Sequence, residues 1–179
     1  RVPGCFDAFE MAARAVLGQQ ITVRAASALA GRIAAAFGAP VETGVEGLTR
    51  TFPPPEAILS LEGGVERRLG ELGVISARAA AMRTIAEKLV KREINLGLCP
   101  SPEEEIKKLL EIRGVGSWTA CYIAMRAMSW TDAFLETDAG IKKALAGYTP
   151  KELLKMSEEW KPWRSYATVN IWNSLYKED

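Results

Sequence analysis

The sequence predicts an all-α protein of one domain, and three observations support that fold class. Apolar residues recur at intervals of three and four, as on a helix with one buried face, and no segment shows the alternation of a half-buried strand. Several of these stretches are rich in alanine, the best helix former. The chain length of 179 residues fits one domain, or two lobes that share a core.

Turn residues divide the first half of the chain into helical segments. A long connection at 38–55 collects glycines and three consecutive prolines, Pro53 to Pro55, which cannot continue a helix. Ser76 is a candidate N-cap for the longest segment. The helices predicted here cover residues 5–17, 23–37, 55–61, 63–73 and 76–93.

The second half continues in the same way. Ser101, Pro102 and three glutamates form a typical helix start, because the N-terminus of a helix favours negative charge. Pro162 is predicted in the first turn of the last helix. The helices predicted here cover residues 101–112, 117–128, 138–147, 150–160 and 163–176.

The composition excludes several classes of protein. With 48% hydrophobic and 25% charged residues the chain is globular, and no apolar run approaches the ~18 residues of a membrane span. There is no histidine, which removes the common catalytic triads and the commonest metal ligand, and the three cysteines form no CxxC pair. We therefore expect no membrane partner and a reducing, cytoplasmic location. The net charge of +1 means that any nucleic-acid binding must come from local geometry.

The segment Leu110–Ala120 reads as a helix, a tight turn and a second helix. Gly114 and Gly116 allow positive φ and leave backbone N–H groups unshielded at a helix start, together with those near Ser117 and Thr119. Such a turn is a candidate seat for a DNA phosphate. From these residues alone, an ordinary interhelical turn is an equally good interpretation.

Wider motifs favour the phosphate seat. LLEIRGVGSWTA resembles the helix-hairpin-helix motif of base-excision DNA glycosylases, and FLETDAGIKK resembles the aspartate-bearing segment of that superfamily. PGCFDAFEMAARAVLGQQITV and WKPWRSYATVNIW resemble segments of the AlkA-type 3-methyladenine DNA glycosylase II. The resemblance covers nearly the whole chain.

The resemblance implies a fold and an activity. We expect the helix-hairpin-helix glycosylase fold, with two helical lobes flanking an active-site cleft, in a single catalytic domain over 1–179. The hairpin would lie at about 110–120 and the aspartate-bearing segment at about 134–143. The β-rich N-terminal domain of the family is not in this sequence, through truncation or because this member lacks it.

The implied activity is excision of alkylated bases of the 3-methyladenine type from damaged duplex DNA, by a monomer without an organic cofactor. The hairpin of relatives can hold a monovalent cation through backbone carbonyls, and no other metal site is expected. Asp138 matches the catalytic aspartate, although capping of the following helix would also explain it.

An aromatic pocket is implied beside the aspartate. Trp118, Tyr122 and Trp172 match positions that line the pocket for the flipped base, where electron-rich rings would bind an electron-poor or cationic purine. Met125 continues the face of Trp118 and Tyr122, and a stripe of this kind is also typical of a core. Bifunctional relatives carry a lysine where this chain has Trp118, so a monofunctional enzyme is implied.

Gln20 matches the position of the wedge that fills the gap left by the flipped base, a position that is usually apolar. A surface glutamine in a turn is the alternative, and Gln19 is the next candidate. Arg24 and Arg78, near predicted helix starts, are weaker candidates for contacts with the DNA backbone.

Three further expectations concern the last third of the chain. Arg164 could contact a phosphate or a carboxylate. Lys142 and Lys143 read as a solvated helix face. Packing between the two lobes is expected for the aromatic residues Trp160, Trp163 and Tyr166.

Two other classes of function compete with the glycosylase. A non-catalytic helix-hairpin-helix DNA-binding module would keep the phosphate seat but has no need of Asp138 beside aromatic residues. A helical scaffold that does not bind DNA would leave the Gly-Val-Gly turn unexplained.

Overall fold

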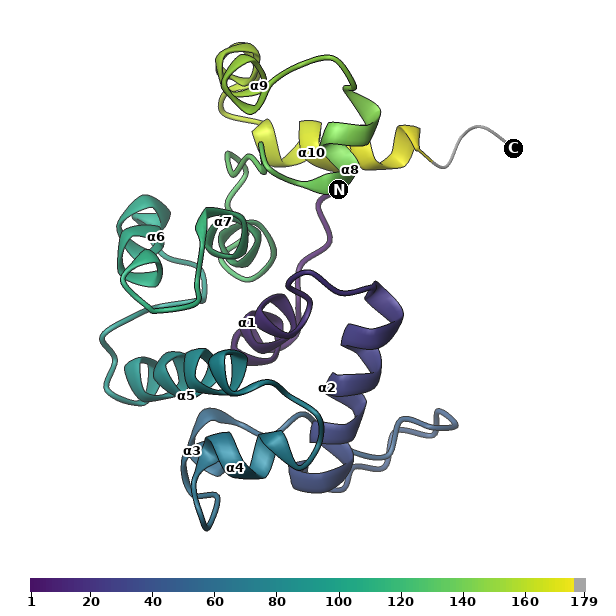
Figure 1. Ribbon diagram of the computed structural model, residues 1–179, viewed down its shortest axis with the longest axis vertical. Coiled ribbons are helices and arrows are strands. Elements are labelled where there is room, and N and C mark those ends of the chain that lie inside the picture. Colours follow the sequence, from purple (N-terminus) through teal and green to yellow (C-terminus); the bar gives the residue numbers. More distant parts are fainter. Residues whose placement is uncertain (176–179) are drawn as a thin grey trace.

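The computed structural model describes residues 1–175, which fold into helices joined by turns (Figure 1). The predicted all-α fold class is confirmed, since these residues include no β-strand and only one isolated bridge, between Pro40 and Arg50. Residue 176, at the end of the last predicted helix, lies outside the described residues. The helices are α1 (Ala8–Leu17), α2 (Val23–Phe37), α3 (Pro55–Leu59), α4 (Val65–Gly70), α5 (Ser76–Val90), α6 (Pro102–Leu110), α7 (Ser117–Arg126), α8 (Ala139–Ala144), α9 (Pro150–Ser157) and α10 (Arg164–Ser174), with a 3₁₀ turn at Glu158–Trp160.

Side-chain caps fix several helix starts. The Asp7 carboxylate accepts a hydrogen bond from the Glu10 N–H at 2.6 Å, and the Thr22 hydroxyl accepts one from the Ala25 N–H at 3.2 Å. Several predicted helix starts differ from the observed ones by one to three residues, and two predicted roles at helix starts are wrong. Ser76 is the first residue of α5 and makes no cap, and Pro162 precedes α10, whose N-cap is Trp163.

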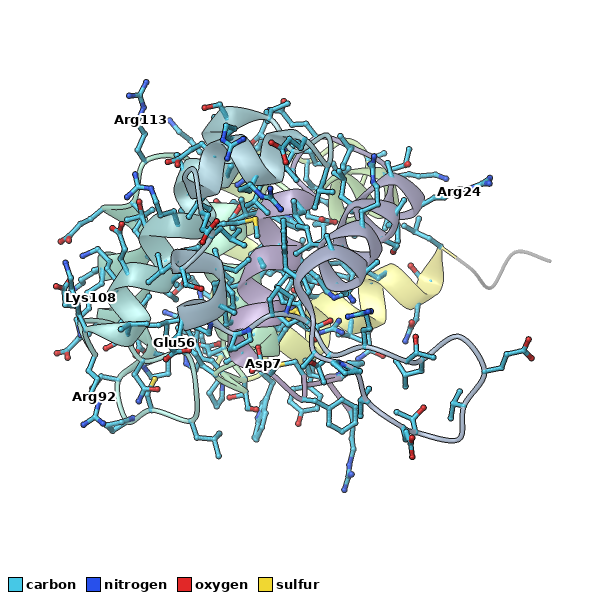
Figure 2. All side chains as sticks on the ribbon, turned by 90° about the horizontal axis from the view of Figure 1, so that it is seen from below. Asp7, Arg24, Glu56, Arg92, Lys108 and Arg113 are labelled. Atoms are coloured by element: carbon cyan, nitrogen blue, oxygen red, sulfur yellow. The ribbon has the colours of Figure 1, made fainter. Side chains whose placement is uncertain are left out.

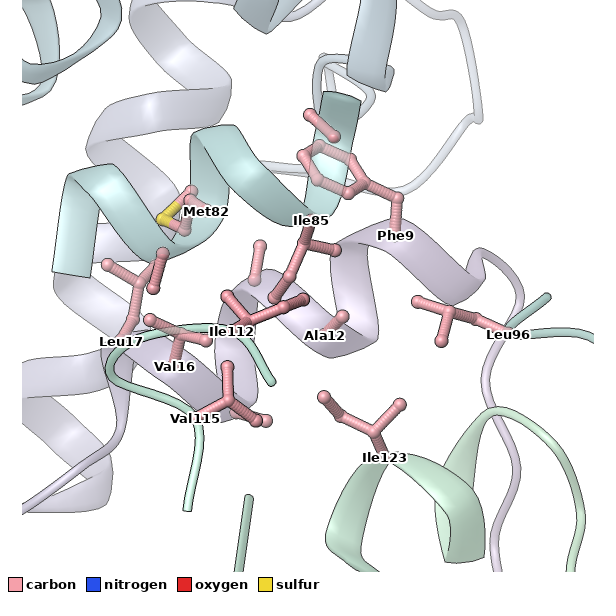
Figure 3. Packing of buried hydrophobic residues seen from close by; sticks show 14 of the residues in the cluster. Phe9, Ala12, Val16, Leu17, Met82, Ile85, Leu96, Ile112, Val115 and Ile123 are labelled. Atoms are coloured by element: carbon pink, nitrogen blue, oxygen red, sulfur yellow. The ribbon is translucent and has the colours of Figure 1, made fainter. Parts of the chain in front are cut away.

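Two hydrophobic cores organise the molecule. The first lies among α1 to α7, and Figure 3 shows Phe9, Val16, Met82, Ile112 and Ile123 converging there. The second, smaller core is built from residues of α7 and of the segments that follow it, together with Val2 from the N-terminal segment. In Figure 1 helices α8, α9 and α10 accordingly form a separate group above the others.

Helix α7 belongs to both cores. Its buried Ile123 packs in the first core, whereas Met125, which is 1% exposed, packs in the second. The face that carries Trp118 and Tyr122 also contacts the second core. The expected two lobes are therefore present, and α7 lies between them. None of the helices within residues 1–175 has the length and apolar character needed to cross a membrane.

A candidate active site between the two lobes

Asp138 lies at the N-cap of α8, where three N–H groups fix its carboxylate. Oδ1 accepts hydrogen bonds from the Ile141 N–H at 3.0 Å and from the Trp172 indole Nε1 at 2.8 Å. Oδ2 accepts one from the Trp118 indole Nε1 at 2.9 Å. An ionised carboxylate offers about four lone-pair positions, so one position, on Oδ2, is still open to a reacting group or a water.

The three aromatic residues of the predicted pocket come together beside this carboxylate. The rings of Trp118 and Tyr122 are stacked, with centroids 5.0 Å apart and an angle of 8° between the planes. The ring of Trp172 is tilted by 49° to that of Tyr122, at 6.5 Å. Met125, which the sequence placed either in the pocket or in a core, is a buried residue of the second core.

The indole groups have a second role that the sequence did not reveal. They orient the carboxylate through hydrogen bonds that span 20 residues for Trp118 and 34 residues for Trp172. The role of Gly140 was also missed at the level of sequence, because it depends on contacts with a residue far away in the chain. A Cβ at this position would lie 2.9 Å from Trp172 Cδ1 and 3.0 Å from Asp138 Oδ1, so a glycine is required by close packing rather than by backbone angles.

A cavity and a groove meet at Asp138. The cavity, of about 780 Å³, is lined by Trp118, Tyr122 and Trp172 among others. The groove is more open, has a volume of about 1000 Å³, and runs from Asp138 to the hairpin and to the turn between α1 and α2. Trp118 and Asp138 line both. Both volumes lie within the usual range of ligand-binding clefts, about 300–1,000 Å³.

The hairpin uses its two glycines differently. Gly114 has φ +92°, in the left-handed region, as expected. Gly116 has φ −94° and ψ 177°, so it does not use the positive φ that glycine allows, and it is the N-cap of α7. Gly116 and Ser117 are exposed, and no atom lies within 4 Å of a Cβ added at Gly116. The first N–H groups of α7 are therefore unshielded.

Thr119 does not lie on this exposed surface. It is 2% exposed, and its hydroxyl accepts a hydrogen bond from Gln19 Nε2 at 2.9 Å. The Thr119 hydroxyl thus supports the turn between α1 and α2, and the contact of its backbone N–H with a DNA phosphate stays a prediction.

Gln19 and Gln20 point to different surroundings. Gln19 Nε2 also donates to the Gly114 carbonyl at 2.8 Å, so Gln19 ties the turn to the hairpin. Arg78 was predicted as a weaker candidate for a contact with the DNA backbone. In the structure its guanidinium donates a hydrogen bond to the Gln19 carbonyl and so supports the same turn. Gln20 is exposed, with φ +55°, and lines the groove. The wedge role of Gln20 stays a prediction.

The structure decides between the two alternatives for Arg164. Its Nε and Nη2 donate to the two carboxylate oxygens of Asp132, each at 2.7 Å, and this pairing raises the pKa of the guanidinium. Arg164 thus forms an ion pair with Asp132 inside the protein, and its guanidinium is not a phosphate contact. Arg24 is exposed, and Figure 2 shows it extending outward at the right of the molecule, whereas the hairpin residue Arg113 extends outward at the upper left.

The remaining aromatic and basic candidates lie in the second core or at the surface, away from the cavity. Trp160 packs edge-on against Phe134 in the second core, at 5.6 Å. Trp163 and Tyr166 form an edge-to-face pair at the surface, 57% and 37% exposed, so packing between the lobes is wrong for these two residues. Lys142 and Lys143 are exposed, as predicted.

Two further kinds of reactive group are the cysteine thiols and the possible metal ligands. Burial raises the pKa of Cys121 to about 11, so its thiol is protonated at neutral pH. Within residues 1–175, His, Cys, Asp and Glu nowhere form a group of three or more that could hold a metal ion. The hairpin carbonyls are the remaining donors for a cation, and the Gly114 carbonyl has one lone pair left after its bond to Gln19.

Comparisons with known proteins identify the fold. No family profile matches the chain. A DNA-3-methyladenine glycosylase from Archaeoglobus fulgidus superposes with a TM-score of 0.76 at 25% identity, over 99% of this chain and 62% of that one. A Schizosaccharomyces pombe 3-methyladenine DNA glycosylase in complex with abasic DNA gives a TM-score of 0.75 at 23% identity, over 99% and 85% of the two chains. The fold is that of the helix-hairpin-helix DNA glycosylases.

Sequence similarity narrows this class. The chain is 36% identical over 172 residues to DNA-3-methyladenine glycosylase 2 of Escherichia coli, covering 96% of this chain and 59% of that protein. It is 31% identical over 185 residues to a DNA-3-methyladenine glycosylase of Bacillus subtilis, covering 98% and 60%. The chain is a relative of the AlkA-type 3-methyladenine DNA glycosylases, and it spans about three fifths of the length of these two.

Proposed function

We propose that this domain is a monofunctional DNA glycosylase that removes alkylated bases of the 3-methyladenine type from damaged duplex DNA. One observation carries the proposal: the Asp138 carboxylate is held by three N–H donors at the wall of an aromatic cavity. A non-catalytic DNA-binding module would not need this arrangement. The names of the relatives support the same activity.

The reaction would be hydrolysis of the bond between C1′ of the deoxyribose and the base nitrogen. The bond breaks with its electron pair leaving on the base, and positive charge develops on the sugar. The Asp138 carboxylate stabilises that charge because it is fixed in a site partly shielded from water. A water oxygen then bonds to C1′ and gives one proton to the surrounding solvent, which leaves a free base and an abasic site.

The cavity would receive the base after it rotates out of the stack. Trp172 and Trp118 offer aromatic faces to an electron-poor purine, and alkylation already weakens the bond to be broken. Trp118 has no amine, so no Schiff base with the sugar forms at this position, and water is the nucleophile.

The duplex would lie across the groove and the hairpin. The free N–H groups at the start of α7 would bind a phosphate, and Gln20 would occupy the space left by the base. The proposal includes a monomer acting in the cytoplasm without an organic cofactor. A monovalent cation at the hairpin carbonyls would supply positive charge next to that phosphate.

The test is the Asp138→Asn variant, assayed for release of bases from methylated DNA. We expect the rate to fall at least about 100-fold, because the charge that opposes the developing cation is lost, while duplex binding changes by no more than a few fold. Asp7→Asn is the matched control, since Asp7 also caps a helix but lies outside the cavity. Retention of more than about a tenth of the rate would contradict the role of Asp138.

Borohydride treatment tests the monofunctional part of the proposal. The expected product is an intact strand with an abasic site, and no protein–DNA adduct should be trapped, because Trp118 replaces the lysine of bifunctional relatives. A trapped adduct would show that another amine reaches C1′.

A further inference from the structure

The turn between α1 and α2 carries a side-chain amide that the protein itself does not use. Gln20 is exposed, its backbone lies in the left-handed region at φ +55°, and within residues 1–175 its amide makes no hydrogen bond. Gln19, its neighbour in the chain, bonds twice through its own amide, to the Gly114 carbonyl and to the Thr119 hydroxyl. Of these two amides, that of Gln20 is the one open to a ligand.

The backbone on both sides of Gln20 is held in place. The Gln19 carbonyl accepts a hydrogen bond from the guanidinium of Arg78 in α5. Two residues after Gln20, the Thr22 hydroxyl caps α2 by accepting a hydrogen bond from the Ala25 N–H at 3.2 Å. The base of the Gln20 side chain is therefore fixed relative to α2 and α5 in the absence of DNA.

Gln20 shares one groove with two other parts of the proposed site. The groove is lined by Gln20, by Gly116 at the start of α7 and by Asp138. On the proposed function, a duplex that places a phosphate at the hairpin and a sugar at Asp138 also lies against Gln20. The gap left by the flipped base is then the space that the Gln20 side chain enters.

An amide inside that gap differs from the apolar wedge that is usual at this position. The amide loses its water on entering the stack, and a buried donor or acceptor without a partner weakens binding by about tenfold. An apolar side chain has no such cost. The groups open to the amide at the centre of the gap are those on the Watson–Crick edge of the opposite base, because the neighbouring bases are still paired.

We propose that Gln20 recognises the base opposite the lesion and favours an unpaired pyrimidine. Thymine donates its N3–H to Oε1 of the amide and accepts from Nε2 at O4, whereas cytosine donates from N4 and accepts at N3. Thymine and cytosine are the normal partners of adenine and guanine, so this preference suits alkylated purines. The inference rests on the proposed glycosylase function and adds a specificity for the second strand.

The test measures binding to duplexes that carry a stable abasic analogue opposite thymine or opposite difluorotoluene, which has the shape of thymine but lacks its strong hydrogen-bonding groups. Fluorescence anisotropy gives the ratio of the dissociation constants for difluorotoluene and thymine. This ratio should be about tenfold larger for the unmodified protein than for Gln20→Met, because methionine fills the gap without an amide. Both proteins meet the same two duplexes, so differences between the DNAs themselves cancel.

A cytosine duplex and a second variant complete the comparison. The unmodified protein should bind the cytosine duplex within about threefold of the thymine duplex, since both bases satisfy the amide. Arg24→Gln is the matched control, because Arg24 is exposed and lines neither the cavity nor the groove. Its loss of charge affects all duplexes alike, so the ratio should stay within about twofold of the original.

Equal ratios in the unmodified protein and in Gln20→Met would overturn the proposal, since Gln20 would then only fill space or remain outside the gap. Should Gln20→Met fail to fold, Gln20→Leu is the second apolar variant. Failure of the unmodified protein to bind abasic duplexes more tightly than undamaged DNA would contradict both this proposal and the proposed function.

The binding ratio also separates this proposal from the glycosylase activity. Absence of base release from methylated DNA contradicts the proposed function alone, because binding to the abasic duplexes needs no catalysis. The ratio then decides by itself whether Gln20 recognises the opposite base. A difference of about tenfold between the unmodified protein and Gln20→Met supports that role, and equal ratios contradict it.

Discussion

The carboxylate of Asp138 caps α8 and faces the cavity at the same time. The two roles are compatible because the Ile141 N–H and the Trp172 indole share Oδ1, while Oδ2 is bonded only to Trp118. A side chain with three fixed donors keeps one rotamer without help from a substrate. The orientation of the proposed catalytic group is therefore set in the absence of DNA, which is the condition for efficient electrostatic stabilisation.

The close packing at Gly140 predicts the effect of a single substitution. In Gly140→Ala the new methyl group would displace Trp172 and the carboxylate, since the Cβ position lies 2.9 Å and 3.0 Å from their atoms. We expect base release to fall at least about tenfold, because small misplacements of catalytic groups are costly. The assay on methylated DNA measures the rate, and far-UV circular dichroism checks the fold.

Gly31→Ala is the control for this substitution. Gly31 lies within α2, and no atom comes within 4 Å of an added Cβ. The variant should be more stable by about 0.5–1 kcal/mol, from the better helix propensity of alanine, with an unchanged rate. A Gly140→Ala enzyme with the original rate would show that Trp172 moves away freely.

At the scale of elements, the hairpin and the turn between α1 and α2 form one unit. Gln19 joins them through the Gly114 carbonyl and the Thr119 hydroxyl, across about 100 residues of sequence. The surface proposed to bind phosphate and the residue proposed to fill the gap are thus held at a fixed separation. Displacement of one would move the other.

The variant Gly116→Val tests the proposed phosphate binding at the hairpin. The fold should tolerate it, because φ is −94° and there is open space at the Cβ position, but the side chain covers the N–H groups at the start of α7. Affinity should fall for all duplexes alike, by about fivefold or more, because phosphate contacts do not read bases. Fluorescence anisotropy with two unrelated sequences measures this, and a loss confined to one sequence would exclude the phosphate role.

The second prediction for this unit concerns Gln20→Ala. Binding to a duplex with a flipped abasic analogue should weaken by about 1 kcal/mol more than binding to undamaged duplex, because a group that fills the gap offsets part of the cost of unstacking. Gln19→Ala is the comparison. It should lower the melting temperature and weaken binding to both duplexes, since it breaks two hydrogen bonds that hold the turn. Equal effects of Gln20→Ala on the two duplexes would make Gln20 an ordinary surface residue.

The sequence predicted the helices well because their signals are local. Apolar spacing and alanine content locate α1, α2 and α7, and errors such as those at Ser76 and Pro162 concern only helix starts. The resemblance to a family supplied Asp138 and the aromatic residues. The bonds from the two indoles to Asp138, the packing at Gly140 and the bridge made by Gln19 join distant segments, so no periodic pattern records them.

At the scale of the whole molecule, α7 couples the two cores. Ile123 is fully buried in the first core, and Met125 is buried in the second, two residues further along the same helix. Neither lobe can lose its packing on α7 without disturbing the other. We therefore expect the protein to unfold as one cooperative unit.

Ile123→Ala tests this coupling. The substitution should lower the free energy of unfolding by about 2–5 kcal/mol, the usual effect of removing a buried isoleucine side chain. All five tryptophans lie at position 118 or later, so their fluorescence reports α7 and the second lobe, whereas far-UV circular dichroism reports every helix. The two transitions should coincide and shift together, and Met125→Ala should behave in the same way. Separate transitions would mean that the lobes are independent.

The position of α7 has a further consequence for how damage would be found. The helix rises about 1.5 Å per residue, so the proposed phosphate-binding end at Ser117 and the backbone of Tyr122 are about 7.5 Å apart along the axis of one rigid helix. On the proposed function, a nucleotide whose phosphate lies at Ser117 would bring its base to Tyr122 only after the base has left the stack. Base pairs that open with little energy would therefore be sampled more often, before any contact reads their chemistry. The scaffold itself would act as a filter for local flexibility of the duplex.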